Sequence, residues 1–308
     1  MKPSASSAFC RAAELASSVP VPSVSLGPSV SIGMPAYNGG KFIEAAIRSL
    51  LAQTASDFEL IISDDASSDD TQAICEKYAA LDSRIIYLRQ PRNIGPGRNF
   101  MHVLAQARAP FFMWAAQDDI WAETWIATLV ANIRPTDMAV RGVLRFMVDD
   151  KIAVNRTPAD YPKGSYLRIF MGTETTYNAR NLYIYGLFRR EALLGLDLSV
   201  LIRNGYSWDF IFVFQLTAQG DLRCIQSTYQ TYRLHQQSDG SQVMAKYKNW
   251  QRLLYRVQPL SYYQQYLAVA PGHIKPWIIA LIPLKHVYSQ ALLWWRGFRK
   301  LVLRRQNI

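Results

Sequence analysis

Two hydrophobic periods alternate along residues 29–125. Short apolar runs predict buried strands, and the segments between them carry apolar residues at helical spacing. The expected strands are Val30–Met34, Phe58–Ile62, Arg84–Arg89 and Phe111–Ala116, and the expected helices are Ile43–Leu51, Thr71–Ala80 and Arg98–Ala107. Strands and helices that alternate at these lengths imply right-handed crossovers. The pattern therefore predicts an α/β fold with a mainly parallel central sheet flanked by helices.

The stretch 126–240 has a less regular pattern. We expect helices at Trp125–Ile133 and Ser207–Gln219, strand material within 139–155, and a last strand at Leu222–Tyr232. Residues 241–308 are helical by pattern. Half of the chain is hydrophobic and 19% is charged, which predicts a globular rather than a disordered protein.

Polar and acidic clusters follow three of the predicted strands, at Pro35–Gly40, Asp64–Asp70 and Gln117–Asp119. The ends of parallel strands meet at one edge of a sheet, so we expect the clusters to converge. Asp118 and Asp119 would repel each other there unless a cation neutralises them. Magnesium prefers one or two carboxylates together with diphosphate oxygens. The convergence favours a metal–diphosphate site over a solvated turn.

Other residues of these clusters suit a nucleotide. The first turn can present backbone N–H groups and the Tyr37 ring to a base or ribose, and the Asp64 carboxylate can accept hydrogen bonds from either. Arg98, at a helix start, adds positive charge. Asp69 and Asp70 are better explained as N-terminal caps of the following helix.

The motifs occur in an order that resembles family 2 glycosyltransferases, which have the GT-A fold. They are Val30–Asn38, Ile61–Thr71, Asn93-x-Gly95 with Arg98-Asn99, and Gln117–Trp121, and the resemblance covers roughly residues 29–240. It implies a nucleotide-diphosphate-sugar donor, a divalent metal (Mg²⁺ or Mn²⁺) at Asp118 and Asp119, and transfer with inversion. The nucleotide-sugar-binding residues that it implies are Pro35, Ala36, Tyr37, Asn38, Asp64, Asp65, Arg98, Gln117, Asp118, Arg233 and His235.

The second half supplies a candidate base. Tyr206–Phe210 resembles the family's helix start beneath the acceptor, where Asp209 could accept the proton of the acceptor hydroxyl. A simple acid at a helix start is the alternative. Trp208 would stack on an acceptor sugar or fill the core, and Gly186 would line the acceptor site.

The run Tyr232–Ser238 resembles the family's closing motif, from which Arg233 or His235 could reach the diphosphate or the metal. An ordinary surface histidine is the alternative. Ala116 stands where the family often has another acid, so the metal would depend on Asp118 and Asp119, with His235 as a further candidate ligand. The Gln-x-x-Arg-Trp motif of processive synthases is absent from the sequence, which favours the addition of one sugar at a time.

The net positive charge of the chain is concentrated in the tail. Residues 241–308 hold 11 of the 34 Lys/Arg residues and no acid, whereas residues 1–240 hold 23 basic and 23 acidic residues. A basic aromatic tail favours an anionic membrane surface over nucleic acid. A helical wheel predicts an apolar face and a polar face; the first holds Leu284, Tyr288, Ala291, Leu292, Trp295 and Phe298, and the second Lys285, Ser289, Arg296, Arg299 and Lys300. Docking of this helix on the core is the alternative.

These observations predict three parts: a Ser/Ala/Pro-rich leader at 1–28, a GT-A domain at 29–240 with halves 29–125 and 126–240, and a basic helical tail at 241–308. The unclustered cysteines Cys10, Cys75 and Cys224 predict a reducing compartment without a disulfide or zinc site. We expect a cytoplasmic enzyme, peripheral at the inner face of the membrane, that acts in synthesis of a cell-surface polysaccharide or a lipid-linked glycan.

Two alternatives stay open at this point. A sugar-phosphate nucleotidyltransferase could use a similar sheet and metal, but the segment Gly39–Lys41 makes an unconvincing phosphate loop. A non-catalytic homologue that binds sugar nucleotides is conceivable because of Ala116 and Trp208.

Overall fold

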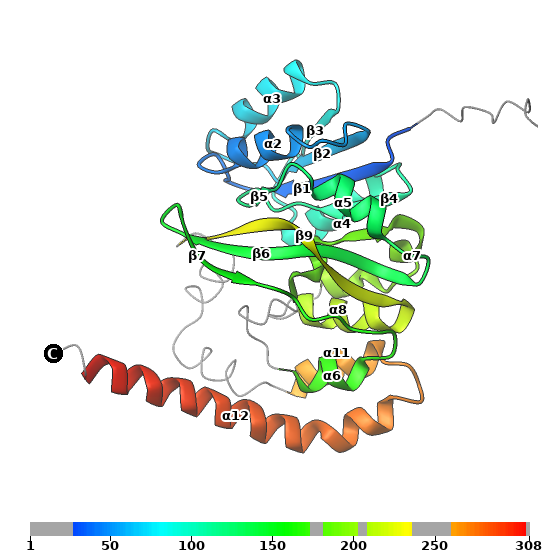
Figure 1. The fold of residues 1–308 in the computed structure, drawn as a ribbon, viewed down its shortest axis with the longest axis vertical. Helices are drawn as coiled ribbons and strands as arrows, with labels where there is room; N and C mark the ends of the chain where they lie inside the picture. The colour runs from blue at the N-terminus through cyan, green and yellow to red at the C-terminus, as the bar shows by residue number, and fades with distance from the viewer. Residues whose placement is uncertain (1–26, 173–180, 203–207, 236–259, 306–308) are drawn as a thin grey trace, which may run out of the picture.

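The computed structural model describes residues 27–172, 181–202, 208–235 and 260–305. Nearly all of the predicted leader, Cys10, and the segment that joins the last strand to the tail lie outside these residues. The described part contains one nine-stranded sheet with helices packed on both of its faces (Figure 1).

The first half alternates strands and helices as its hydrophobic pattern predicts. The elements are β1 (Val30–Ala36), α2 (Ile43–Leu51), β2 (Phe58–Asp64), α3 (Thr71–Leu81), β3 (Ile85–Arg89), α4 (Pro96–Gln106) and β4 (Phe111–Trp114). Strands β3, β2, β1 and β4 are parallel neighbours in that order. Ala36 is in register with Asp64, so the ends of β1 and β2 lie side by side.

The second half makes the sheet mixed. Its elements are β5 (Ile120–Trp121), α5 (Trp125–Asn132), β6 (Asp137–Val148), β7 (Lys151–Arg156), α6 (Tyr166–Met171), η2 (Asn181–Tyr185), β8 (Leu187–Arg189), α7 (Arg190–Leu194), η3 (Leu198–Leu201), α8 (Trp208–Gln219) and β9 (Asp221–Leu234). The sheet order is β3-β2-β1-β4-β8-β6-β9-β5, with β7 beside β6. Strand β8 is antiparallel to both β4 and β6, whereas β6 and β9 are parallel. The predicted α/β class is confirmed, and the strand pairs among β1, β2, β3 and β4 are all parallel.

Alternation along the strands divides the core between the two faces of the sheet. Met113 packs with α2, α3 and α5 on one face, while its neighbours Phe112 and Trp114 pack with α4 and α8 on the other. All three side chains are fully buried. Burial of a large apolar side chain stabilises a fold by about 1.5–3 kcal/mol, so these alternating residues hold both helical layers against the strands.

The tail packs on this body through two helices, α11 (Leu260–Val269) and α12 (Lys275–Arg305). Tyr266 is fully buried, and its ring lies 5.2 Å from the ring of Phe170 and 5.1 Å from that of Phe214. Lys285, which the helical wheel groups with the charged positions, instead faces the protein, because its Nζ donates to the Gly172 carbonyl at 2.9 Å. Within the residues that the structure describes, no helix has the length and apolar character needed to cross a bilayer.

Candidate functional site

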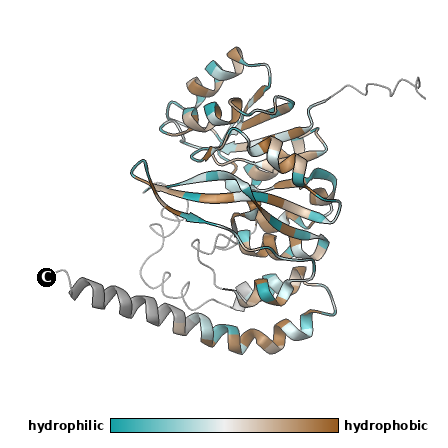
Figure 2. Ribbon diagram, viewed as in Figure 1, coloured by the Kyte–Doolittle hydropathy of each residue, from teal (hydrophilic) through white to brown (hydrophobic). Residues whose placement is uncertain are grey.

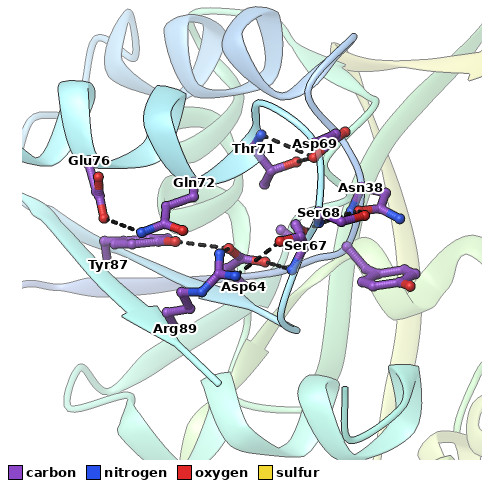
Figure 3. Close-up of polar contacts among 12 residues, drawn as sticks. Asn38, Asp64, Ser67, Ser68, Asp69, Thr71, Gln72, Glu76, Tyr87 and Arg89 are labelled. Carbon is purple, nitrogen blue, oxygen red and sulfur yellow. Dashed lines mark hydrogen bonds and ion pairs between the residues drawn. The ribbon is translucent and has the colours of Figure 1, made fainter. Parts of the chain in front are cut away.

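The turn after β1 is held by the loop that precedes α3 (Figure 3). The backbone N–H groups of Asn38, Gly39 and Gly40 donate to side-chain oxygens of Ser67, Thr71 and Asp69, at 2.9, 2.8 and 2.9 Å. Of the two acids predicted to cap α3, Asp69 accepts from the Thr71 backbone at 3.1 Å, whereas Asp70, which occupies the N-cap position, makes no side-chain cap hydrogen bond.

These bonds leave few free groups in the turn. The backbone N–H groups of Asn38, Gly39 and Gly40 are satisfied within the protein, whereas the Tyr37 ring is about half exposed at 48%. Among the residues of the turn, the Tyr37 ring is therefore the group best placed to stack on a base.

Gln117 joins the ends of β1 and β4. Its amide accepts from the Tyr37 backbone N–H at 2.9 Å and donates to the Tyr37 carbonyl at 3.0 Å. A Cβ atom at Gly39 would lie 2.3 Å from the Gln117 Oε1, so a larger residue there would displace the Gln117 amide from this position. Gln117 thus positions the turn rather than reaching outward with its amide.

The two acids at the end of β2 are also engaged by the protein. Asp64 is fully buried and accepts hydrogen bonds from the Ser67 backbone (2.8 Å), the Tyr87 hydroxyl (2.9 Å) and the Arg89 guanidinium (3.0 Å). Burial and the bond to Asp64 raise the pKa of Tyr87. Asp65 accepts from the backbone N–H groups of Ile94 and Gly95 at 2.6 and 3.0 Å. Both carboxylates therefore shape the loops around this edge of the sheet.

The first turn of α4 packs against the same edge of the sheet. Asn99 donates to the Ser63 carbonyl at 2.8 Å, and its own Oδ1 is buried without a hydrogen-bond partner among the described residues. Arg98, the preceding residue, is exposed. The ring of Phe100 lies 5.6 Å from that of Trp208, which brings the start of α8 to the start of α4.

The acidic pair after β4 divides into an inner and an outer carboxylate. Asp119 is buried and accepts from the Gln230 amide at 2.7 Å and the Arg233 backbone at 3.1 Å. Burial and the neighbouring Asp118 raise its pKa well above the ordinary range. Asp118 is 22% exposed, and its Oδ2 lies 2.7 Å from the Nε2 of His235. Asp118 and His235 thus form the open part of this cluster.

A buried arginine supports the inner carboxylate, and the sequence patterns did not predict it. Arg141 on β6 is fully buried and donates to the side-chain amide oxygen Oε1 of Gln230 at 3.0 Å, so the Gln230 side chain bridges Arg141 and Asp119. Burial lowers the pKa of Arg141 to about 10. The signal in the sequence is a lone cation within the apolar run Met138–Leu144.

A divalent ion suits the outer pair. Carboxylate and imidazole ligands are used for such ions, and diphosphate oxygens commonly supply the remaining ligands. The described residues contain no group of three or more acidic, histidine or cysteine side chains that could hold a metal without such help. Arg233, whose guanidinium lies 5.0 Å from the centre of the Phe42 ring, is next but one to His235 and adds positive charge there.

The residues predicted for the acceptor lie on α8 and before β8. Asp209 is half-buried in the first turn of α8, and its Oδ1 accepts from the Phe210 backbone at 3.0 Å. The Trp208 ring packs against Phe100 and the core. Gly186 is buried, and a Cβ atom there would lie 2.9 Å from the Val140 carbonyl oxygen. Tyr206 and Ser207 lie outside the described residues.

The contacts therefore bring together the ends of β1, β2, β4 and β9 and the starts of α4 and α8. Pro35 and Ala36 contribute through the backbone of β1, since Ala36 accepts from the Asp65 N–H at 2.8 Å. Most of the predicted residues lie within this arrangement, but several act on its loops instead of pointing outward.

Comparison with known proteins agrees with this architecture. Residues 31–195 match the family model described as glycosyl transferase family 2. Among curated proteins, the chain is 36% identical over 104 residues to the Campylobacter jejuni GalNAc(5)-diNAcBac-PP-undecaprenol beta-1,3-glucosyltransferase, covering 33% of this chain and 34% of that protein. It is 34% identical over 96 residues to the putative teichuronic acid biosynthesis glycosyltransferase TuaG of Bacillus subtilis, covering 30% and 37%. These matches span about a third of the length of the curated relatives.

Solved structures share the fold at low sequence identity. The S. aureus TarS fragment 1–349 in complex with UDP superposes with a TM-score of 0.56 at 15% identity, over 85% of this chain and 89% of that one. The mannosyltransferase PcManGT of Pyrobaculum calidifontis, in complex with GDP-Man and Mn²⁺, gives 0.53 at 16% identity, over 92% and 79%. Both likenesses concern the fold alone.

Proposed function

The chain belongs to glycosyl transferase family 2, and on that premise we propose that it transfers a single sugar from a nucleotide-diphosphate donor to an acceptor hydroxyl. The observation that carries the proposal is the open pair Asp118–His235, 2.7 Å apart, beside loops from three strand ends that the chain ties together.

The nucleotide would bind along the strand ends of the first half. We propose that the Tyr37 ring stacks on the base, with Arg98 near the sugar or phosphate groups, since both side chains are exposed. Asp64, Asp65 and Gln117 would keep the surrounding loops in place. Relatives with this fold were solved with UDP and with GDP-Man, so we leave the base open.

A divalent metal would sit at the diphosphate. Asp118 and His235 would hold it from the protein side, and Asp119 would orient Asp118 from the buried side. When bound, the ion would neutralise the negative charge that develops on the departing diphosphate. Arg233 adds to that positive charge.

Asp209 is the proposed base. It would take the proton from the acceptor hydroxyl as that oxygen forms a bond to the anomeric carbon. The bond between this carbon and the diphosphate oxygen breaks, its electron pair leaves with the nucleoside diphosphate, and the configuration inverts.

The relatives suggest an acceptor class. One is named as a glucosyltransferase acting on an undecaprenol-linked glycan, and another for teichuronic acid biosynthesis. We propose a cell-surface or lipid-linked glycan acceptor, reached at the inner face of the membrane.

The test is transfer or slow hydrolysis of UDP- and GDP-sugars by the full chain in the presence of Mn²⁺. Asp118→Asn should remove most of the metal-dependent activity, and Asp209→Asn should lower kcat by about 100-fold or more while nucleotide binding persists. Glu191→Gln is the matched control, since Glu191 is an exposed acid in the first turn of α7.

Other outcomes would contradict the proposal. Full transfer by Asp209→Asn would show that another group is the base. Release of pyrophosphate from a nucleoside triphosphate and a sugar phosphate would identify a nucleotidyltransferase. Metal-dependent nucleotide binding, seen as a raised melting temperature, without turnover of any donor would identify a binding homologue.

A further inference from the structure

Helix α12 has one buried face and one exposed face. Ile278 and Lys285, seven residues or about two turns apart, are both buried against the body of the protein. The side chain of Lys285 donates to Gly172, next to the end of α6. These contacts fix the rotation of α12 against the body and leave other sides of the helix exposed.

Part of the exposed surface of α12, here called the outward face, is apolar and lies about 100° around the helix from the buried residues Ile278 and Lys285. Trp277, Ala280, Leu284, Tyr288 and Ala291 are all exposed and recur at steps of three or four residues, as a single stripe along a helix. Val287 lies beside the stripe and is 65% exposed. Figure 2 shows hydrophobic positions along this first part of α12.

This concentration of exposed apolar side chains is unusual within the described part of the molecule. Of the ten large hydrophobic side chains that are exposed there, five lie between residues 277 and 288, and the others are spread over several elements. Contiguous apolar patches on a helix that is otherwise folded against its protein mark an interaction surface. In Figure 1, α12 lies at the end of the molecule opposite α3.

The charge of the helix indicates the partner. Helix α12 carries seven basic residues and no acid, and five of the seven fall in its last ten residues. The whole segment 241–308 is acid-free. An apolar stripe on a helix whose sequence is basic and acid-free matches the interface of an anionic bilayer, where apolar side chains enter the acyl boundary and negative surface charge favours a basic segment.

We propose that the outward face of α12 docks the protein, lying flat, on an anionic membrane surface. This deepens the membrane part of the proposed function and rests on it. Leu284 and Val287 would be the central contacts, flanked by Trp277 and Tyr288 at headgroup level, where aromatic rings are favoured. The buried face, with Lys285, would keep the rest of the protein attached to the docked helix.

The test is co-sedimentation of the full chain with vesicles of phosphatidylcholine and phosphatidylglycerol, compared with phosphatidylcholine alone, without sugar donor or acceptor. We expect binding at least about 10-fold stronger to the anionic vesicles, weakened by added salt. The double variant Leu284→Asp/Val287→Asp should lower the vesicle partition coefficient by about 10-fold or more. The matched control is Leu81→Asp/Ile152→Asp, which alters two exposed residues on α3 and β7 and should bind like the wild type.

Equal binding by the wild type and the α12 double variant would overturn the proposal. So would a dimer in light scattering that the α12 substitutions convert to a monomer, since the face would then bind a second copy. The substituted residues are exposed, so an unchanged melting curve is expected and separates lost docking from lost folding. Transfer to a water-soluble acceptor, measured without vesicles, tests the glycosyltransferase proposal separately.

Discussion

At the scale of single residues, the carboxylates of this edge of the sheet have different tasks. Asp118 is open to solvent and touches His235, whereas Asp64 is enclosed and accepts three hydrogen bonds from the protein. A buried carboxylate that loses its partners or its charge leaves donors unsatisfied, which is costly. We therefore expect Asp64 to contribute mainly to stability.

Asp64→Asn should lower the free energy of unfolding by about 1–3 kcal/mol, because the amide presents N–H groups to Tyr87 and Arg89, which are themselves donors. Urea unfolding of the unliganded protein measures this. Asp57→Asn, an exposed acid just before β2, is the control and should be nearly neutral. A variant that keeps its urea midpoint but loses nucleotide binding would assign Asp64 directly to the sugar nucleotide instead.

Glu59 on β2 provides a pH-dependent test. Its side chain is buried and accepts from Ser31 at 2.6 Å and from the Arg108 guanidinium at 2.6 and 3.0 Å. Burial alone would raise the pKa of Glu59, but these bonds outweigh burial and hold it below the usual value of 4.5. A lowered folded-state pKa means that Glu59 stabilises the protein above the unfolded value, and that this stabilisation is lost as the pH falls.

Glu59→Gln should therefore be less stable than the wild type by about 1–3 kcal/mol at pH 7, with the difference shrinking below about pH 4.5. Urea unfolding across a pH series measures the gap. Glu123→Gln, at an exposed position, should show no such convergence. A gap that widens in acid would mean that the sign of the Glu59 pKa shift is wrong.

At the scale of elements, the hydrophobic pattern predicted helices and strands whose formation depends on residues close together in the sequence. From β1 to β4, each strand and helix was predicted to within two residues, because strand and helix periods differ clearly in alternating segments. The two-residue strand β5 was not predicted. The stretch 139–155 was predicted to be strand material and forms the antiparallel hairpin β6–β7, whose turn was not predicted. Its turn uses Asp149 and Asp150 at φ of 47° and 57°, and Asp-Asp is a weaker hairpin signal than Asn-Gly or Asp-Gly.

The sequence predicted site residues that directly follow a parallel strand, because the ends of such strands meet at one edge of the sheet. It did not predict contacts between residues that lie far apart in the chain. Asp118 follows a strand that the pattern identifies. The hydrogen bond from Gln230 to Asp119 joins residues 111 positions apart, and the hydrogen bond from Arg141 to Gln230 joins residues 89 positions apart. Such pairs depend on the β6–β9 register, including its shift between Gly142 and Val143, which no local period specifies. The role of each predicted site residue remains a prediction that mutation must test.

The contact between α4 and η3 yields a prediction at this scale. A Cβ atom at Gly97 would lie 1.9 Å from the Leu201 carbonyl oxygen, a backbone atom that cannot rotate away. Gly97→Ala should therefore move α4 or η3 and lower the free energy of unfolding by about 2–4 kcal/mol. Gly272→Ala, where nothing lies within 4 Å of the added atom, is the control.

A displacement of α4 should also change the kinetics at the proposed nucleotide-sugar site. Residues Arg98 and Asn99 follow Gly97 directly, so Gly97→Ala should raise the KM for the nucleotide sugar more than it lowers kcat. Thermal melting and steady-state kinetics of the two alanine variants give both quantities. If Gly97→Ala melts like the wild type, the close approach of α4 to η3 does not constrain the fold.

At the scale of the whole molecule, the tail is both a part of the core and a surface. Helix α11 contributes Tyr263 and Tyr266 to the same hydrophobic cluster as α8 and β4. Helix α12 leaves its outward stripe uncovered. The two tail hypotheses drawn from the sequence, docking on the core and contact with a membrane, therefore concern different faces and are compatible.

The docking of the tail predicts a global effect of a single substitution. Tyr266→Ala removes a fully buried ring that packs between Phe170 and Phe214, and a cavity of this kind costs about 3–5 kcal/mol. Because α11 belongs to the main hydrophobic cluster, the loss of this ring should lower the urea midpoint of the single transition in which the entire chain unfolds. Tyr288→Ala, on the exposed stripe, should leave the urea midpoint unchanged in the absence of membranes. A separate early transition in Tyr266→Ala, with the main one unmoved, would mean that the tail folds independently on a finished domain, and α12 would then be tethered to the body only loosely.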